Sequence, residues 1–155
     1  MPKPRRVALV DDHKLVRAGL KSLINGLRDY RVDHEGGDGV DAISIVENHG
    51  PDVLVLDVSM PKVSGIEALK RIRLSGHNLP VLMLSMYDSP EFVVNSLKHG
   101  ADGYILKDSA EDELHLALDY AIKKQPFLSP HVTRHLVNLT HTAVNDYDDV
   151  PAHLT

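Results

Sequence analysis

Two patterns of hydrophobic residues alternate along the chain. Short, mostly apolar runs occur at residues 7–10, 32–35, 53–56, 81–84 and 104–106. Continuous runs of this length are typical of strands that are buried on both faces of a sheet. Between the runs, apolar residues recur with helical spacing, first at Val16, Leu20, Leu23, Ile24 and Leu27, and later at Leu114, Ala117, Leu118 and Ala121. The alternation predicts five strand–helix units, a parallel sheet and helices on both of its faces.

Three sites along the chain carry signals for the start of a helix. Asp38 precedes Asp41, and Ser109 precedes Asp112, with the spacing of a capping box. Pro90 stands where a proline is tolerated in the first turn of a helix. These signals agree with helices that begin after the second, fourth and fifth apolar runs.

The last thirty residues differ from the rest of the chain. Ser129 and Pro130 can start one more helix, with Val132, Leu136 and Leu139 on one face. After His141 the chain is acidic, most clearly at 145–150, and has no apolar period. We therefore expect one folded domain over residues 1–125, followed by a linker helix and a flexible linker over 126–155.

Polar groups stand where four of the predicted strands end. Asp11 and Asp12 follow the first run, Asp57 the third, Ser85 the fourth and Lys107 the fifth. Each residue alone fits an ordinary cap, loop or solvated lysine. In an open parallel sheet, however, ligands bind at the carboxyl ends of the strands. The joint placement of five polar groups at that edge therefore predicts a functional site.

The charges in this predicted site indicate its chemistry. Three neighbouring carboxylates repel one another by about 4 kcal/mol per pair at 4 Å and an effective dielectric of about 20. One lysine does not offset this repulsion, so either the pKa values rise or a cation binds. Magnesium suits one or two carboxylates together with phosphate oxygens. Carboxylates, a divalent ion, a lysine and a hydroxyl are the parts needed for phosphoryl transfer, in which one carboxylate can become an aspartyl phosphate.

Composition excludes several other classes of protein. The 155 residues suffice for one domain, and the formal charge of −5 argues against a nucleic-acid surface on this stretch of chain. There is no cysteine, hence no disulfide, thiol nucleophile or thiolate metal site. No apolar run approaches the roughly 18 residues of a membrane span. We expect a cytoplasmic protein without membrane association.

The motifs at the strand ends resemble those of a response-regulator receiver domain of two-component signalling. The matching stretches are VALVDDH, VLVLDVSMPKVSG, VLMLS and ADGYILKD, within residues 5–125. The segments HKLVRAGL and KDS look most like the NarL/FixJ subfamily. This resemblance implies an α/β, flavodoxin-like (βα)5 doubly wound parallel sheet with strand order 2-1-3-4-5, plus a C-terminal linker helix.

The resemblance also implies a role for each matching residue. Asp57 would be the phosphoacceptor, which receives a phosphoryl group from a sensor histidine kinase. Asp12, Asp57 and the backbone carbonyl of Ser59 would ligate Mg²⁺, and Asp11 would act mainly through a metal-bound water. The resemblance implies three further roles, two in contacts with the phosphoryl group and one in a conformational switch, for Lys107, Ser85 and Tyr104. Lys107 would pair with the phosphoryl group, Ser85 would hydrogen-bond it, and Tyr104 would move inward as Ser85 shifts.

Such a domain would control a transcriptional output. Members of the subfamily usually carry a C-terminal helix-turn-helix of the LuxR type, which often opens near a Leu-Thr pair, and this sequence ends at Leu154 and Thr155. The resemblance thus implies DNA binding only through a domain absent from this sequence. It also implies a possible homodimer on phosphorylation and no enzymatic activity beyond self-catalysed phosphorylation and dephosphorylation.

Other interpretations start from the same residues. One is a degenerate receiver that acts without phosphorylation. Another is an aspartyl-phosphate phosphatase, which normally has a second aspartate where this chain has Ser59. An FMN carrier of the flavodoxin type would need a phosphate loop where Asp11 and Asp12 stand. His131, His135 and His141 have a spacing that zinc sites use, but no cysteine or carboxylate stands at a matching interval.

Overall fold

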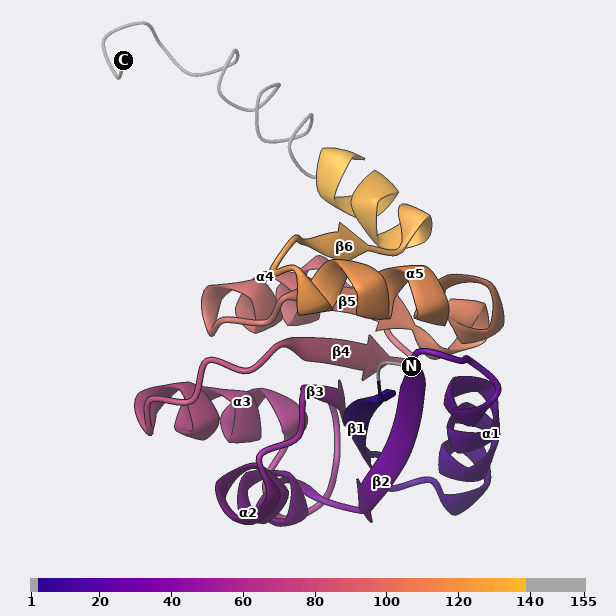
Figure 1. Cartoon of the computed structure of the whole chain (residues 1–155). Helices are drawn as coiled ribbons and strands as arrows, with labels where there is room; N and C mark the ends of the chain where they lie inside the picture. The colour runs from indigo at the N-terminus through magenta and orange to yellow at the C-terminus, as the bar shows by residue number, and fades with distance from the viewer. Residues whose placement is uncertain (1–2, 139–155) are drawn as a thin grey trace, which may run out of the picture.

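The computed structural model describes residues 3–138, which form a parallel sheet with helices on both faces (Figure 1). The strands are β1 (Arg5–Val10), β2 (Tyr30–Gly36), β3 (Val53–Asp57), β4 (Val81–Ser85), β5 (Gly103–Leu106) and β6 (Phe127–Leu128). They lie in the order β2-β1-β3-β4-β5-β6, and every pair is parallel. The predicted flavodoxin-like fold and its 2-1-3-4-5 order are confirmed, with one strand added at the edge.

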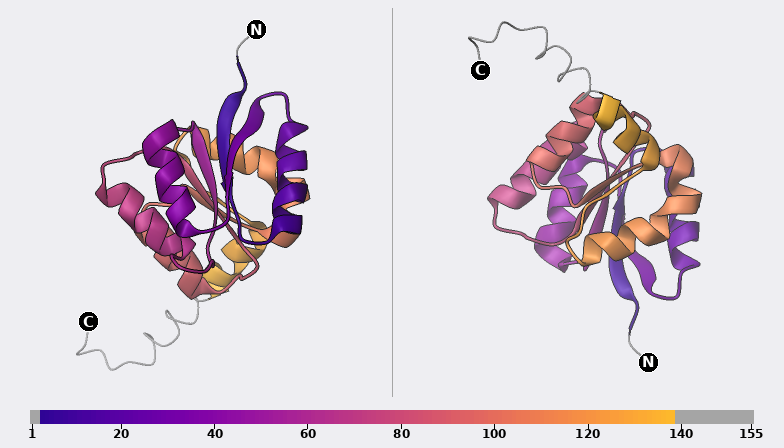
Figure 2. Two further views of the ribbon diagram at one scale, coloured as in Figure 1. Left: turned by 90° about the horizontal axis from the view of Figure 1, so that it is seen from below. Right: turned by 90° about the horizontal axis from the view of Figure 1, so that it is seen from above.

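The helices divide between the two faces of the sheet. They are α1 (Lys14–Asn25), α2 (Gly39–His49), α3 (Gly65–Leu74), α4 (Pro90–Lys98) and α5 (Ala110–Ile122), and a further helix occupies residues 130–138. Helices α1 and α5 cover one face, while α2, α3 and α4 cover the other (Figures 1 and 2). The sheet thus separates two hydrophobic cores.

The two central strands supply both cores at once. Every residue of β3 and β4 is buried, as their continuous apolar runs predict. Side chains alternate across the sheet, so Val55 lies in the core under α1 and α5, while Leu54 and Leu56 lie in the other core. Burial on both faces makes β3 a rigid support for Asp57, its last residue.

The three predicted helix starts are correct, but only one of the two predicted capping boxes forms its side-chain bond. Asp38 caps α2, because its Oδ1 accepts the Asp41 N–H at 2.8 Å. The Ser109 side chain makes no such bond to Asp112. Its backbone is not extended as a capping residue requires, since residues 107–109 form a 3₁₀ turn that leads directly into α5. Pro90 occupies the first turn of α4 as predicted.

The predicted linker begins with structure that packs on the sheet. Strand β6 extends the edge beside β5, and the helix after it buries Val132 completely. Two residues are too few to produce a periodic signal, so the sequence analysis missed β6. Leu139, His141 and the acidic stretch 145–150 lie outside the described residues. Within residues 3–138, no helix has the length and apolar character needed to cross a membrane.

Two leucines on α5 test this packing. Leu118 is fully buried in the core on the α1 and α5 face of the sheet, whereas Leu116 is half-exposed. We expect Leu118→Ala to lower the free energy of unfolding by about 2–5 kcal/mol, because it leaves a cavity in the core. Leu116→Ala on the same helix should cost less than about 1 kcal/mol. Urea denaturation followed by circular dichroism measures both, and equal losses would contradict this packing.

Candidate functional site

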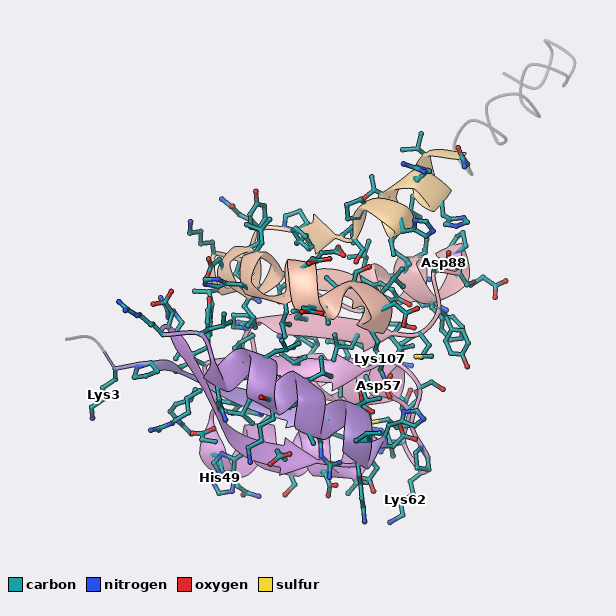
Figure 3. The ribbon with its side chains drawn as sticks, turned by 90° about the vertical axis from the view of Figure 1, so that its right-hand side faces the viewer. Lys3, His49, Asp57, Lys62, Asp88 and Lys107 are labelled. Carbon is teal, nitrogen blue, oxygen red and sulfur yellow. The ribbon has the colours of Figure 1, made fainter. Side chains whose placement is uncertain are left out.

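The polar groups predicted at the strand ends do meet at one edge of the sheet. Asp57 ends β3, Ser85 ends β4, and Lys107 follows β5. Asp11 and Asp12 directly follow β1, which lies next to β3 in the sheet. Figure 3 shows Asp57 and Lys107 together at this end of the molecule.

The loop after Asp57 is held close to the strand ends. Val58 donates its N–H to the Leu84 carbonyl at 2.9 Å, and Gly65 donates its N–H back to the Val58 carbonyl at 2.9 Å. A side chain at Gly65 would overlap the carbonyl oxygen of Asp57. Glycine therefore allows α3 to begin directly against the end of β3.

Lys107 joins two carboxylates that come from different strands. Its Nζ lies 2.8 Å from Asp11 Oδ2 and 3.2 Å from Asp57 Oδ2. All three side chains are at most 4% exposed. A buried ion pair of this kind depends on its partners, since removing one leaves an uncompensated charge. The ammonium group thus balances part of the repulsion between the two acids.

Burial and charge shift the pKa values of this pair. Burial raises the pKa of Asp57 to about 6, against the opposing effect of Lys107 and with a further rise from Asp11. Burial lowers the pKa of Lys107, but the hydrogen bond and charge of Asp11 and the charge of Asp57 outweigh it and raise the pKa overall. The lysine therefore stays protonated at neutral pH, whereas keeping Asp57 as a buried carboxylate costs free energy.

The acid cluster contains a buried carboxylate oxygen that accepts no hydrogen bond within residues 3–138. Asp12 Oδ1 is buried and accepts no hydrogen bond from the described residues. His13 lies beside it, with its ring Nδ1 at 3.3 Å from Asp12 Oδ1, and the backbone N–H of His13 donates to Asp11 Oδ1 at 2.8 Å. One ligand atom from each of these three residues and Asp57 falls within 4.8 Å of the others. Sequence analysis missed His13, although its position directly after the acidic pair is a signal.

Ser85 and Tyr104 meet at the backbone of Tyr87. The Ser85 hydroxyl oxygen accepts the Tyr87 N–H at 2.9 Å. The Tyr104 hydroxyl donates to the Tyr87 carbonyl at 2.7 Å, and the whole Tyr104 side chain is buried. Burial raises the pKa of this phenol to about 12. Tyr104 therefore occupies an inward position and links β5 to the loop after β4.

The peptide bonds of the described chain, and two histidines of its last helix, have ordinary geometry. Every peptide bond in residues 3–138 is trans, including that between Lys107 and Asp108. The His131 and His135 rings contact each other edge to face at 6.0 Å. Among the described residues, neither belongs to a cluster of three metal-ligating groups. His135 instead pairs with Asp88 at 2.9 Å.

Solved structures show the same arrangement of the fold. A two-component response regulator of the LuxR family from Aurantimonas sp. SI85-9A1 superposes with a TM-score of 0.84 at 30% identity, over 88% of this chain and 98% of that one. The receiver domain of the putative response regulator NarL from Mycobacterium tuberculosis gives a TM-score of 0.73 at 35% identity, over 77% of this chain and 98% of its own.

Sequence comparisons identify the family. The chain is 36% identical over 131 residues to the nitrate/nitrite response regulator NarL of Escherichia coli, covering 84% of this chain and 61% of that protein. It is 34% identical over 141 residues to the transcriptional regulatory protein DegU of Brevibacillus brevis, covering 91% and 60%. The chain thus spans about 60% of the length of these two relatives. Residues 7–119 match the response regulator receiver domain model, and the chain belongs to this family as a receiver domain of the NarL/LuxR type.

Proposed function

We propose that Asp57 is the phosphoacceptor of this receiver domain and that its phosphorylation controls a transcriptional output. The observation that carries this proposal is the buried pair of Asp57 and Lys107 inside a cluster of acids. A carboxylate at the end of a rigid strand, with a raised pKa and a lysine at 3.2 Å, can act as a nucleophile toward phosphorus.

The acid cluster fits a magnesium ion. Asp11, Asp12 and Asp57 offer carboxylate oxygens, the ligands that Mg²⁺ prefers, and Asp12 Oδ1 accepts no hydrogen bond from the described residues. Asp12, Asp57 and the Ser59 carbonyl would hold the ion directly, and Asp11 would hold it through water. When bound, Mg²⁺ would neutralise charge on the phosphoryl oxygens.

Each protein group has a defined part in the transfer. An Asp57 carboxylate oxygen attacks the phosphorus of a phosphohistidine, so an O–P bond forms while the N–P bond breaks. The electron pair of the N–P bond returns to the imidazole of the donor. Lys107 keeps its proton and pairs with the phosphoryl oxygens as the charge moves from the donor to Asp57. Ser85 donates its hydroxyl hydrogen to one of these oxygens. Tyr104 moves together with the loop after β4 as Ser85 shifts.

The donor would be a sensor histidine kinase, and the domain would be a phosphoacceptor rather than an enzyme that acts on a separate substrate. Relatives such as NarL and DegU are longer than this chain. They are named as a response regulator and a transcriptional regulatory protein. We therefore propose that DNA is bound through another domain of the whole protein, that phosphorylation favours a homodimer, and that the protein works in the cytoplasm. Family membership supports each of these statements.

Acetyl phosphate, a small phosphoryl donor, tests the acceptor. With Mg²⁺ the wild-type chain should gain the mass of one phosphoryl group in intact-mass spectrometry. The gain should vanish in EDTA and in Asp57→Asn, which lacks the nucleophile. Asp108→Asn, an exposed change beside Lys107, is the matched control and should behave as wild type. If Asp57→Asn is phosphorylated to the wild-type extent, the phosphoacceptor is another residue.

The raised pKa of Asp57 predicts how stability depends on pH without metal. The pKa is raised from 3.8 to about 6 on folding, so the folded state binds the proton more tightly. Stability should therefore fall as the pH rises from about 4 to about 6 and carry the full penalty above that range. In EDTA at pH 7.5, Asp57→Asn should be more stable than wild type by about 1–3 kcal/mol.

Urea denaturation from pH 4 to 8, with Asp108→Asn as control, measures this difference. The advantage of Asp57→Asn should shrink toward pH 4, where wild-type Asp57 is protonated in the folded state. Mg²⁺ should also narrow it, because an ion that binds the wild-type acid cluster more tightly stabilises that chain more. An advantage that is the same at every pH would show that the charge of Asp57 is not its cause.

A further inference from the structure

Strand β6 and the helix after it attach to the end of β5 through one buried serine. Ser129 donates its N–H to the Tyr104 carbonyl at 3.0 Å, and its Oγ accepts the Leu106 N–H at 3.1 Å. The residue is fully buried. Without this hydroxyl the Leu106 N–H would lose its acceptor, which is costly inside a protein. Leu106 directly precedes Lys107, so Ser129 fixes the strand end that carries the lysine of the site.

The same segment reaches the loop after β4 through a polar contact between two side chains. His135 Nε2 lies 2.9 Å from Asp88 Oδ2, and both side chains are about 44% exposed. Asp88 directly follows Tyr87, whose N–H binds the Ser85 hydroxyl and whose carbonyl binds Tyr104. Figure 3 shows Asp88 on the loop that faces the final helix. His135 therefore contacts the loop that holds Ser85.

Apolar contacts keep the helix in place between these two attachments. Val132 is fully buried in the core that also contains Tyr104, Met83 and Val93. Leu128 and Leu136 pack against the same core. The helix is thus docked on the fold by a hydrophobic face, and the two polar contacts decide how it is seated relative to the site.

We propose that Ser129 and His135 are positioning residues that couple the segment 127–138 to the phosphorylation site. Ser129 acts through Leu106 on Lys107, and His135 acts through Asp88 and Tyr87 on Ser85. This inference rests on the proposed function, in which Lys107 and Ser85 contact the phosphoryl group. When both residues are drawn to that group, the loop and strand end that hold the segment become fixed, and the segment docks more firmly.

Coupling of this kind is reciprocal. If a phosphoryl group strengthens docking of the segment by some factor, firm docking must strengthen binding of a phosphoryl mimic by the same factor. A residue that merely stabilises the fold would not change the affinity of the site. The affinity for a mimic therefore separates a positioning role from a structural one.

The experiment uses beryllofluoride with Mg²⁺, a non-covalent mimic of a phosphoryl group on a carboxylate. In the whole chain, beryllofluoride should slow amide hydrogen exchange across residues 127–138 by roughly threefold to tenfold. Ser129→Ala and His135→Gln should each lose most of this effect and bind beryllofluoride more weakly, as isothermal titration calorimetry would show. Thr133→Ala and Arg134→Gln change exposed residues of the same helix and should match wild type.

A second pair of variants keeps the test decisive if Ser129→Ala does not fold. Asp88→Asn should weaken beryllofluoride binding as much as His135→Gln does, and the double variant should be no weaker than either, because both changes break one contact. If the wild-type chain binds beryllofluoride but amide hydrogen exchange at 127–138 is unchanged or faster, the coupling is wrong and the proposed function stands. The same holds if all variants bind beryllofluoride with equal affinity. A wild-type chain that binds no beryllofluoride and accepts no phosphoryl group overturns the proposed function, and the coupling with it.

Discussion

The buried contact of Lys107 with Asp11 and Asp57 is the constraint on which the site depends. These three groups come from the ends of β5, β1 and β3, so their contact requires the strand order that the sheet adopts. Without the ammonium group, two buried carboxylates would face each other without compensation, and burying unpaired charge is costly. A single set of contacts therefore depends on the strand order and also balances the charges at this edge of the sheet.

The site is built on the ends of strands that the two cores hold in place. Asp57 ends a strand buried on both faces, and the glycine at the start of α3 holds the loop behind it. Ser85 likewise ends the fully buried β4, and Lys107 follows β5 in a short 3₁₀ turn. A phosphoryl group on Asp57, as proposed above, would add charge directly beside Lys107. Such an arrangement suits the proposed switch, because a local change in charge acts on the groups around it.

The edge of β5 is a part of the surface that the chain covers itself. Strand β6 pairs with it, Ser129 takes up its last N–H group, and the helix at 130–138 packs on the adjoining core. An unpaired strand edge would otherwise expose backbone groups to other chains. The segment that leaves the receiver fold is therefore part of the same packed structure as Ser85 and Tyr104, the proposed switch residues.

The sequence by itself determined the first five strands, the two-sided helical cover and the convergence of the polar residues, because continuous apolar runs and residues at strand ends are local signals. It did not find β6, the position of His13 or the failure of Ser109 to cap α5. Those depend on pairing with β5, on the approach of strands distant in the chain and on a 3₁₀ turn. Likewise, the contacts of Lys107 with its two acids and of His135 with Asp88 join residues far apart in sequence. Only tertiary packing decides such contacts, because they require the sheet to be assembled before the partners meet.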